Sequence, residues 1–230
     1  MMRMLAGTAA LTLLAAGASA QDAPDLTSVV QKFSYAMGYR VARDMTKQGI
    51  KDIDSAALAA GVNDAMASKA FPFDREQLTE IMTAYRTMVE AEQASLAGNN
   101  AEVGKKFLAE NETAEGVQTL PGGIQYKIHT EGEGALPAAD DTVRVHYSGK
   151  LLDGTEFDSS YKRGEPTELN LQNVIPGWRT ALTAMPTGSK WTIWIPSDLA
   201  YGNTGAGGLI GPNSTLSFDI ELIAVVEKAQ

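Results

Sequence analysis

Cysteine is missing from this sequence of 230 residues, and histidine is scarce, with two copies at His129 and His146. A chain without thiols forms no disulfides, no thiolate metal sites and no redox-active cysteine pair. The two histidines fall on different predicted strands, and neither has carboxylates near it at the spacing that metal ligands need. We therefore predict neither a metal site nor a cofactor.

Positive charge is also in short supply. The chain has 19 lysines and arginines against 28 aspartates and glutamates, which gives a formal net charge of −9. Such a surface is repelled by the phosphate backbone of nucleic acids and by anionic lipid headgroups. Nucleic acid is therefore not expected as a partner.

Long hydrophobic runs are absent after the first 20 residues, MMRMLAGTAALTLLAAGASA. Those residues combine Arg3 with a short apolar stretch and an A-x-A motif at 18–20, the pattern of a secretory signal peptide. A membrane anchor is the alternative, but the apolar stretch is shorter than the roughly 20 residues that a spanning helix needs. We expect cleavage of the signal peptide, residues 1–20. The mature protein is then exported without a membrane anchor, and is periplasmic in a Gram-negative source or secreted.

Motifs for covalent chemistry and for phosphate binding are absent as well. Ser159 and Ser160 stand outside a nucleophile elbow and have no assembled base, so we interpret them as serines at the end of a strand. The glycine-rich segment 200–208, AYGNTGAGG, lacks the lysine and the following helix of a phosphate-binding loop. We interpret this segment as a flexible flap.

The sequence from Asp25 to about Asn111 has the periodicity of helices. In its first part, Asp25 or Thr27 is the candidate N-cap and Gly49 the candidate C-cap. The apolar face of this first helix is formed by Leu26, Val29, Val30, Phe33, Met37, Val41 and Met45. A second, shorter helix is expected after Asp54, which takes the N-cap position.

A third helix is expected to begin at Asp74, which forms a capping-box pattern with Gln77. Across the segment Gly98-Asn99-Asn100 its apolar residues keep a seven-residue spacing: Met82, Val89, Leu96 and Val103. That spacing favours one continuous or kinked helix to about Asn111. The alternative is a pair of helices separated by a loop at Gly98.

Methionine is concentrated in the helical half, which contains five of the six methionines after residue 20. Unbranched thioether side chains suit adaptable packing between helices. The residue patterns alone leave two interpretations open, a monomeric helical core and a dimer interface.

A change of pattern at residues 113–123, TAEGVQTLPGG, ends the helical half. Alternating apolar residues then predict strands within 123–132, 142–152, 155–160, 190–196 and 215–226, with a hairpin turn at Asp153-Gly154. One helix fits in this half, at Gly177–Met185. We predict an α+β fold: an all-helical domain with a long connecting helix, then an antiparallel sheet wrapped around one short helix.

Four segments of the second half resemble an FKBP-type peptidyl-prolyl cis-trans isomerase domain: VHYSGKLLDGTEFDSS at 145–160, VIPGW at 174–178, LAYGNTG at 199–205 and IGPNSTLSFDIEL at 210–222. The helical half resembles the N-terminal dimerisation module of the macrophage infectivity potentiator group, through FSYAMGYRVARDM at 33–45 and KKFLAENETAEGVQTLPGGIQYK at 105–127. This resemblance implies a helical dimerisation domain at residues 21–115 and an isomerase domain at residues 116–230. It also implies a homodimer in which the long third helices carry the isomerase domains as the arms of a V.

The resemblance further implies a pocket for a proline ring. Trp178 would form its floor, and its walls would be Tyr147, Phe157, Val174, Ile175 and Phe218. Plain core packing is the alternative for each of these residues.

The polar groups of the implied site come from other segments. The Tyr201 hydroxyl and the Ile175 backbone N–H would donate hydrogen bonds to substrate carbonyl groups, although Tyr201 could instead be a surface tyrosine in a turn. Asp158 would lie beside the carbonyl of the twisting amide, held there by Arg163. A flap would cover the substrate with two apolar residues, Leu209 and Ile210.

Three rim positions depart from the best-known pattern of the family: Thr167 and Leu169, which are commonly aromatic, and Ala206, which is often histidine. We expect a wider and less aromatic rim. We expect this rim to alter the preference for the residue before proline and the affinity for macrocyclic inhibitors such as tacrolimus and rapamycin.

Isomerisation of the bond before proline needs neither a nucleophile nor a metal, because its barrier of about 18–20 kcal/mol comes from the loss of amide resonance on twisting. A dry aromatic pocket with fixed donors lowers that barrier by binding the twisted amide better than the planar one. The expected function is a peptidyl-prolyl cis-trans isomerase that accelerates folding of exported, proline-containing polypeptides. The alternative is a V-shaped dimeric chaperone or peptide-binding clamp with weak or incidental isomerase activity.

Overall fold

The structure is a computed structural model that describes residues 26–47, 50 and 52–226. The predicted signal peptide at 1–20 and the predicted cap residues Asp25 and Gly49 lie outside the described residues. The chain forms two compact units, residues 1–45 and residues 46–230. Most of helix α1 (Val29–Lys47) belongs to the first unit, and all the other described elements belong to the second.

Helix α1 begins with a capping box. The Ser28 N–H donates to Gln31 Oε1 at 2.7 Å, and the Gln31 N–H donates to Ser28 Oγ at 3.1 Å. Ser28 is therefore the N-cap, and the prediction of Thr27 is wrong, because the reciprocal bonds of this box need a partner at the third helical position. The predicted apolar face is exposed in the single chain, with 65% of Phe33 and 83% of Val29 accessible.

Helices α2 (Ser55–Met66) and α3 (Arg75–Asn111) begin at the predicted caps. Asp54 Oδ1 accepts hydrogen bonds from the N–H groups of Ala56 and Ala57 at 2.9 and 3.0 Å. Asp74 and Gln77 form both bonds of a capping box, with the Gln77 N–H donating to Asp74 Oδ1 at 2.9 Å. Both cap predictions are confirmed.

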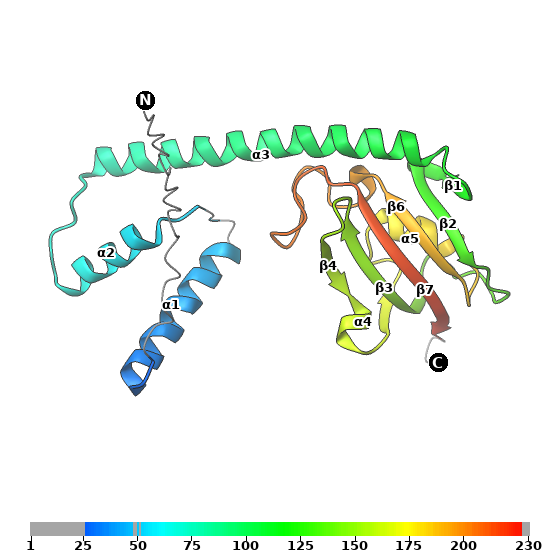
Figure 1. The fold of residues 1–230 in the computed structure, drawn as a ribbon, viewed down its shortest axis with the longest axis horizontal. Coiled ribbons are helices and arrows are strands. Elements are labelled where there is room, and N and C mark those ends of the chain that lie inside the picture. Colours follow the sequence, from blue (N-terminus) through cyan, green and yellow to red (C-terminus); the bar gives the residue numbers. More distant parts are fainter. Residues whose placement is uncertain (1–25, 48–49, 51, 227–230) are drawn as a thin grey trace, which may run out of the picture. The chain divides into compact units, whose positions relative to one another are not determined.

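Helix α3 is a single helix of 37 residues, drawn without a break in Figure 1. The prediction of a continuous helix is confirmed, and the alternative of a loop at Gly98 is wrong. A glycine in a helix interior costs about 1 kcal/mol relative to alanine. Helix α3 continues through Gly98 despite that cost.

The second half of the chain forms one antiparallel sheet in the order β1-β2-β6-β7-β3-β4, with β5 paired to β3. Its strands are β1 (Val117–Leu120), β2 (Ile124–Thr130), β3 (Thr142–Leu151), β4 (Glu156–Ser159), β5 (Thr167–Asn170), β6 (Lys190–Ile195) and β7 (Leu216–Val226). Its helical segments are the 3₁₀ turns η1 (Pro121–Gly123) and η2 (Ser197–Leu199) and the helices α4 (Ser160–Arg163) and α5 (Pro176–Thr183). The predicted α+β fold is confirmed.

Besides the two 3₁₀ turns, three short elements were not predicted. Strand β1 lies inside the segment 113–123 that was interpreted as a junction, β5 adds a strand beside β3, and α4 is a second helix where one was expected. Helix α4 forms because its single turn is capped at both ends. The Lys162 N–H donates to Ser159 Oγ at 3.4 Å, and Gly164 takes the left-handed conformation with φ of 81°.

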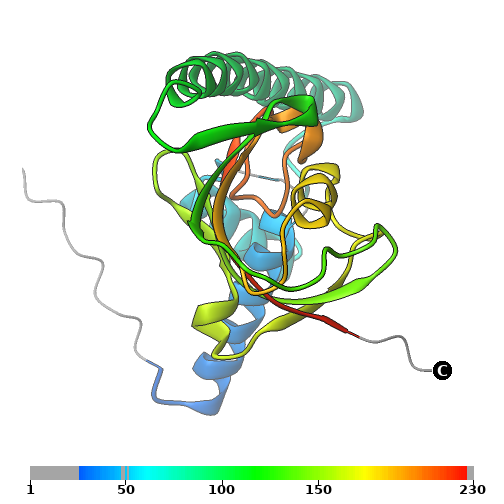
Figure 2. The same cartoon turned by 90° about the vertical axis from the view of Figure 1, so that its right-hand side faces the viewer.

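The core lies between the sheet and α5, and Figure 2 shows the strands curving around this short helix. Alternate residues of the long strands are buried in it, as the predicted alternation required: Val143, Val145, Ile193, Ile195, Ile220 and Leu222. Burying each such side chain contributes about 1.5–3 kcal/mol. A Cβ on Gly177 would meet Ile195 Cγ2 at 2.4 Å, so the absence of a side chain there lets α5 approach the sheet.

The C-terminal half of α3 packs on the sheet. The rings of Phe107 and Trp194 are 6.2 Å apart, and the Gln125 side chain donates to the Leu108 carbonyl at 2.7 Å. Asn111 Nδ2 donates to Gln125 Oε1 at 2.8 Å, so the buried Gln125 amide is satisfied by α3. Within the part of the chain that the structure describes, no helix has the length and apolarity to cross a membrane.

Candidate active site

A pocket of about 280 Å³ opens between α5, the β3–β4 hairpin and the segment after η2. Most of its wall is apolar or aromatic. It is lined by Tyr147, Phe157, Asp158, Leu169, Asn173, Val174, Ile175, Trp178, Tyr201 and Phe218. The structure therefore brings together, in one cavity, residues from segments that lie up to 71 positions apart (218 − 147 = 71).

The base of the pocket is a cluster of aromatic rings around Trp178, which is 4% exposed. Its ring meets those of Tyr147 and Phe218 edge to face, with centroid distances of 5.1 and 5.2 Å. Phe157 meets Phe218 in the same way at 5.6 Å. Edge-to-face pairs are favourable beyond their buried area, because the positive edge of one ring meets the negative face of the other. The pocket base is therefore a closely packed aromatic surface.

The first turn of α5 places Trp178 at the base of the pocket. Pro176 occupies the first helical position, where its missing N–H costs nothing. The Ile175 carbonyl accepts from the N–H groups of Trp178 and Arg179 at 3.0 and 3.2 Å. Among the described residues, no acceptor pairs with the Ile175 N–H, and Ile175 lines the pocket.

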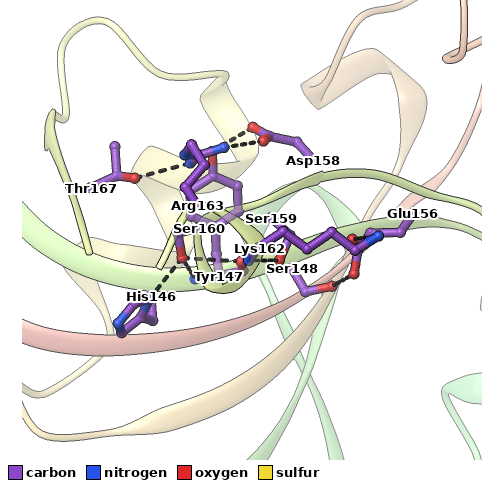
Figure 3. A network of polar contacts seen from close by, with 10 residues as sticks. All are labelled: His146, Tyr147, Ser148, Glu156, Asp158, Ser159, Ser160, Lys162, Arg163 and Thr167. Carbon is purple, nitrogen blue, oxygen red and sulfur yellow. Dashed lines mark hydrogen bonds and ion pairs between the residues drawn. The ribbon is translucent and has the colours of Figure 1, made fainter. Parts of the chain in front are cut away.

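Tyr147 of the ring cluster also belongs to a polar network, which Figure 3 shows. Asp158 accepts hydrogen bonds from the Tyr147 hydroxyl and from Arg163 Nη1. Arg163 Nη2 also donates to the Tyr147 hydroxyl oxygen at 2.9 Å and to Thr167 Oγ1 at 3.0 Å. Arg163 is the last residue of α4, so the unpredicted turn of helix places the guanidinium that holds Asp158.

The network fixes the protonation of its members. Burial raises the pKa of Asp158, but hydrogen bonds from Tyr147 and Arg163 outweigh burial, so that the pKa lies below its ordinary value. Burial, followed by the hydrogen bond to Asp158, raises the pKa of the Tyr147 phenol above its ordinary value. Near neutral pH the site therefore holds a fixed carboxylate and a protonated phenol. Neither group is poised to transfer a proton.

Tyr201 also lines the pocket and lies in the segment after η2. Its side chain is partly exposed, at 39%, and its hydroxyl has no hydrogen-bond partner in the described part of the chain. The backbone beside it is fixed, because the Gly202 N–H donates to the Ser197 carbonyl at 2.9 Å. The arrangement leaves a free donor at the rim of an apolar pocket.

The predicted flap residues lie in a small hairpin. Ala206 and Ile210 exchange two backbone hydrogen bonds at 2.9 and 3.0 Å, and Leu209 lies between them with 57% of its surface exposed. Ile210 is buried with the core. Neither Leu209 nor Ile210 is among the pocket-lining residues, so their covering role stays a prediction.

The rim residues differ in their surroundings. Leu169 lines the pocket, Thr167 binds Arg163, and Ala206 belongs to the flap hairpin. Asn173 also lines the pocket and was not predicted. Its place directly before the VIPGW segment, where the other pocket residues cluster, could have suggested it.

The serines considered as nucleophiles and the histidines considered as metal ligands make contacts within the fold. Ser160 Oγ accepts from the Tyr147 N–H at 2.8 Å and lies 2.9 Å from His146 Nδ1, while the His146 ring stacks on Tyr161 at 4.5 Å. His129 Nε2 lies 2.7 Å from Thr192 Oγ1, on another part of the sheet. The interpretation of Ser159 and Ser160 as strand-end residues agrees with their contacts, because Ser159 caps α4.

Two family models match the chain: one described as FKBP-type peptidyl-prolyl cis-trans isomerase over residues 134–223, and one described as the domain amino terminal to it over residues 30–128. The outer membrane protein MIP of Legionella longbeachae is 41% identical over 99% of this chain and 100% of its own length. The FKBP-type 22 kDa peptidyl-prolyl cis-trans isomerase of Escherichia coli strain K12 is 43% identical over 88% of this chain and 98% of its own.

The fold agrees with a solved member of the same group. The crystal structure of FkpA from Escherichia coli matches with a TM-score of 0.61 at 38% identity, and the match covers 86% of this chain and 97% of that one. Sequence similarity of this extent, together with a shared fold, assigns the chain to a family whose chemistry needs no nucleophile. The chain belongs to the FKBP-type peptidyl-prolyl cis-trans isomerases and is an enzyme that interconverts the cis and trans forms of the bond before proline.

Proposed function

We propose that the pocket around Trp178 is where the substrate's prolyl bond twists. The observation that carries this proposal is the combination of an aromatic base with fixed polar groups at its edge. A twisted amide loses its resonance and is less polar than a planar one, so an apolar pocket binds it preferentially. Stabilising the twisted form more than the planar form is sufficient for catalysis, and no covalent intermediate is required.

The residues of the pocket have distinct roles in this proposal. Trp178 supports the proline ring, and the ring is enclosed by the side chains of Tyr147, Phe157, Val174, Ile175 and Phe218. The Tyr201 hydroxyl and the Ile175 N–H donate hydrogen bonds to the substrate carbonyl groups on either side of the twisting bond. Support comes from two donors, the Tyr201 hydroxyl and the Ile175 N–H, that have no acceptor among the described residues and belong to residues lining the pocket.

Asp158 has an electrostatic role in the proposal. Its carboxylate lies beside the carbonyl carbon of the twisting amide, and the hydrogen bonds from Tyr147 and Arg163 hold it there. Because the carboxylate stays ionised and fixed, its position costs no reorganisation during the reaction. Leu209 and Ile210 belong to the flap that borders the bound peptide.

A protease-coupled assay with a short peptide containing proline tests these roles. We expect Tyr201→Phe and Asp158→Leu each to lower kcat/KM by about tenfold or more, since removal of a fixed transition-state hydrogen bond has effects of that order. Tyr161→Phe is the matched control, because Tyr161 lies outside the pocket and its hydroxyl reaches Glu221. Wild-type activity in both pocket variants would refute the assigned roles while leaving the isomerase activity in place.

The helical half is proposed to make the protein a homodimer, with residues 21–115 as the dimerisation domain and 116–230 as the isomerase domain. Exposed apolar side chains on the helices support this, because a stable monomer would leave them in water. The most exposed of them are Val29, Val30, Phe33, Tyr39 and Met66. Sedimentation of the full mature chain at micromolar concentration should give a dimer, and Val30→Glu with Phe33→Glu should give a monomer. The substitution Lys32→Glu on the same helix is the control for added charge.

The protein is further proposed to act on exported, proline-containing polypeptides in the periplasm, or outside the cell, after removal of residues 1–20. The signal-like sequence supports this location. The mass of the protein recovered from the periplasmic fraction tests it, since cleavage after Ala20 leaves Gln21 as the first residue. Recovery of the full-length chain from the cytoplasm would contradict it.

A second candidate function is a chaperone or peptide-binding clamp, which the exposed apolar helix faces favour. Suppression of aggregation of an unfolded protein by the Tyr201→Phe variant, at wild-type level, would separate this function from isomerisation. Tacrolimus and rapamycin are proposed ligands of the isomerase pocket, with affinities altered by Leu169 and Thr167 at the rim.

A further inference from the structure

The segment that carries Tyr201 is fastened to the long helix. Residues 200–215, here called the flap loop, lead from η2 to β7 and contain both Tyr201 and the flap hairpin. In Figure 1 this orange segment passes beside α3, and hydrogen bonds join the two. Helix α3 lies outside residues 134–223, which match the isomerase family model. A contact here would connect the catalytic loop to a helix that the isomerase domain proper does not contain.

Two asparagine side chains make the connection. Asn100 Nδ2 of α3 donates to the Pro212 carbonyl at 2.8 Å and lies 3.4 Å from Ser214 Oγ. In the reverse direction, Asn213 Nδ2 donates to the Ala97 carbonyl of α3 at 3.4 Å. Both contacts are partly buried, where a hydrogen bond is less exposed to competition from water.

The helix and the loop are also in direct van der Waals contact. A Cβ built on Gly104 of α3 would meet Thr215 Oγ1 at 2.3 Å, and a Cβ on Gly211 would meet Asn100 Nδ2 at 3.0 Å. Two glycines, one on each partner, thus leave room for the close approach. Because the helix and the loop approach so closely, the Asn100 side chain reaches the loop backbone directly.

The anchored end of the flap loop holds the backbone next to Tyr201. The Asn213 N–H donates to the Gly202 carbonyl at 2.7 Å, and Asn213 takes the left-handed conformation with φ of 54°. Gly202 follows Tyr201 directly, and its own N–H is bonded to Ser197 of η2 at 2.9 Å. The tyrosine is therefore held from two sides, by η2 and, through Asn213, by α3.

We propose that Asn100 is a positioning residue for catalysis: it fixes the Pro212–Asn213 segment, which holds Gly202 and so sets the place of the Tyr201 hydroxyl at the pocket. This rests on the proposed role of Tyr201 as a hydrogen-bond donor. Small errors in the position of a donor are costly, since a shift of about 1 Å can lower a rate a hundredfold. The helix thus contributes to the reaction without touching the substrate.

The test uses the full mature chain and a double-mutant cycle of Asn100→Ala with Tyr201→Phe. Alanine is a better helix former than asparagine, so the substitution leaves α3 intact. Asn99→Ala is the matched control, because Asn99 is the exposed neighbour on the same helix. We expect Asn100→Ala to lower kcat/KM for a prolyl peptide by about three- to tenfold, the effect of losing one positioning hydrogen bond. Asn99→Ala should stay at wild-type activity.

The cycle separates positioning from general damage. If Asn100 acts through Tyr201, Asn100→Ala has little left to disturb once the Tyr201 hydroxyl has been removed. Asn100→Ala should therefore change the kcat/KM of the Tyr201→Phe variant by less than about twofold. An equal loss in both backgrounds, or no loss in the wild-type background, overturns the proposal. Thermal unfolding of each variant checks that the loss of activity does not come from a loss of folded protein.

A second variant tests the path through the loop. Asn213→Gly removes the side chain that bonds Ala97 but keeps the N–H that bonds Gly202, and glycine suits the left-handed conformation. We expect a smaller loss than for Asn100→Ala, because the contact it removes is longer, at 3.4 Å. An impaired Tyr201→Phe beside a fully active Asn100→Ala refutes this inference alone. A fully active Tyr201→Phe refutes the proposed role of Tyr201 and the inference with it.

Discussion

The two halves of the described chain differ in how far they bury their large apolar side chains. In the sheet, Ile193, Ile220 and Leu222 are fully buried around α5. On the helices, Phe33 is 65% exposed and Met66 83% exposed in the single chain. The sheet half completes its own core, whereas the helices present faces that a monomer does not cover.

This difference agrees with the different functions proposed for the two halves. A closed core allows the aromatic rings at its edge to be held rigidly, as Trp178 is by Tyr147 and Phe218. Rigid placement is what transition-state binding requires. Open helix faces supply area for association, where adaptable side chains such as methionine are useful. The catalysis and the assembly proposed above are therefore divided between the halves, and α3 contacts the half proposed to be catalytic.

The largest expected effect contrasts two leucines. Leu182 of α5 is fully buried, and Leu78 of α3 is 40% exposed in the single chain. We expect Leu182→Ala to lower the free energy of unfolding by about 2–5 kcal/mol through the cavity it leaves. In dilute protein, Leu78→Ala should cost less than about 1 kcal/mol. Chemical denaturation at several protein concentrations measures both; a cost at Leu78 that grows with concentration would indicate that a second chain covers it.

A smaller effect on stability is expected from substitutions on α3, where this helix contacts the sheet half. Gly104 faces Thr215 at a distance that leaves no room for a methyl group, whereas a Cβ on Gly98 would meet nothing within 4 Å. Gly104→Ala should therefore destabilise the protein by about 1–3 kcal/mol through overpacking. Gly98→Ala should stabilise it by up to about 1 kcal/mol, because alanine is the better helix former. Thermal unfolding compares the two, and equal effects of the same sign would contradict the close contact.

The elements that sequence patterns predicted well are those with long periodicity or a specific cap. Helix α3 combined a capping box at Asp74 with seven-residue spacing, and that spacing correctly outweighed the glycine at 98. The long strands alternated clearly, as in Val143, Val145 and Tyr147. Both signals are local, so the sequence contains them in full.

The elements that were missed depend on contacts distant in sequence. Strand β5 exists because residues 167–170 pair with β3, and α4 is one turn that places Arg163 against Asp158. The pocket itself could be assembled from the sequence only through family resemblance, since Tyr147 and Phe218 come from different strands. The contact between Asn100 and Pro212 had no sequence signal, because 112 positions separate the two residues.

The smallest expected effect concerns the pH dependence of stability in the sheet half. Hydrogen bonds from Tyr147 and Arg163 keep the pKa of Asp158 below its ordinary value of 3.8 despite the opposing effect of burial. A depressed pKa in the folded state stabilises the protein above the unfolded value, and this stabilisation is lost as the pH falls through the folded value. The contribution is modest, because the Asp158 side chain is 45% exposed and solvent screens the ion pair.

Urea denaturation of the wild type and of Asp158→Asn across the acidic range measures this contribution. We expect the difference between them to be largest near neutral pH and to shrink as the pH falls below 3.8. In a Tyr147→Phe background, which removes one of the hydrogen bonds that depress the pKa, the difference should be smaller near neutral pH, and its loss should be complete at a higher pH. A difference that stays constant over this range would show that the charge of Asp158 does not contribute to folding stability.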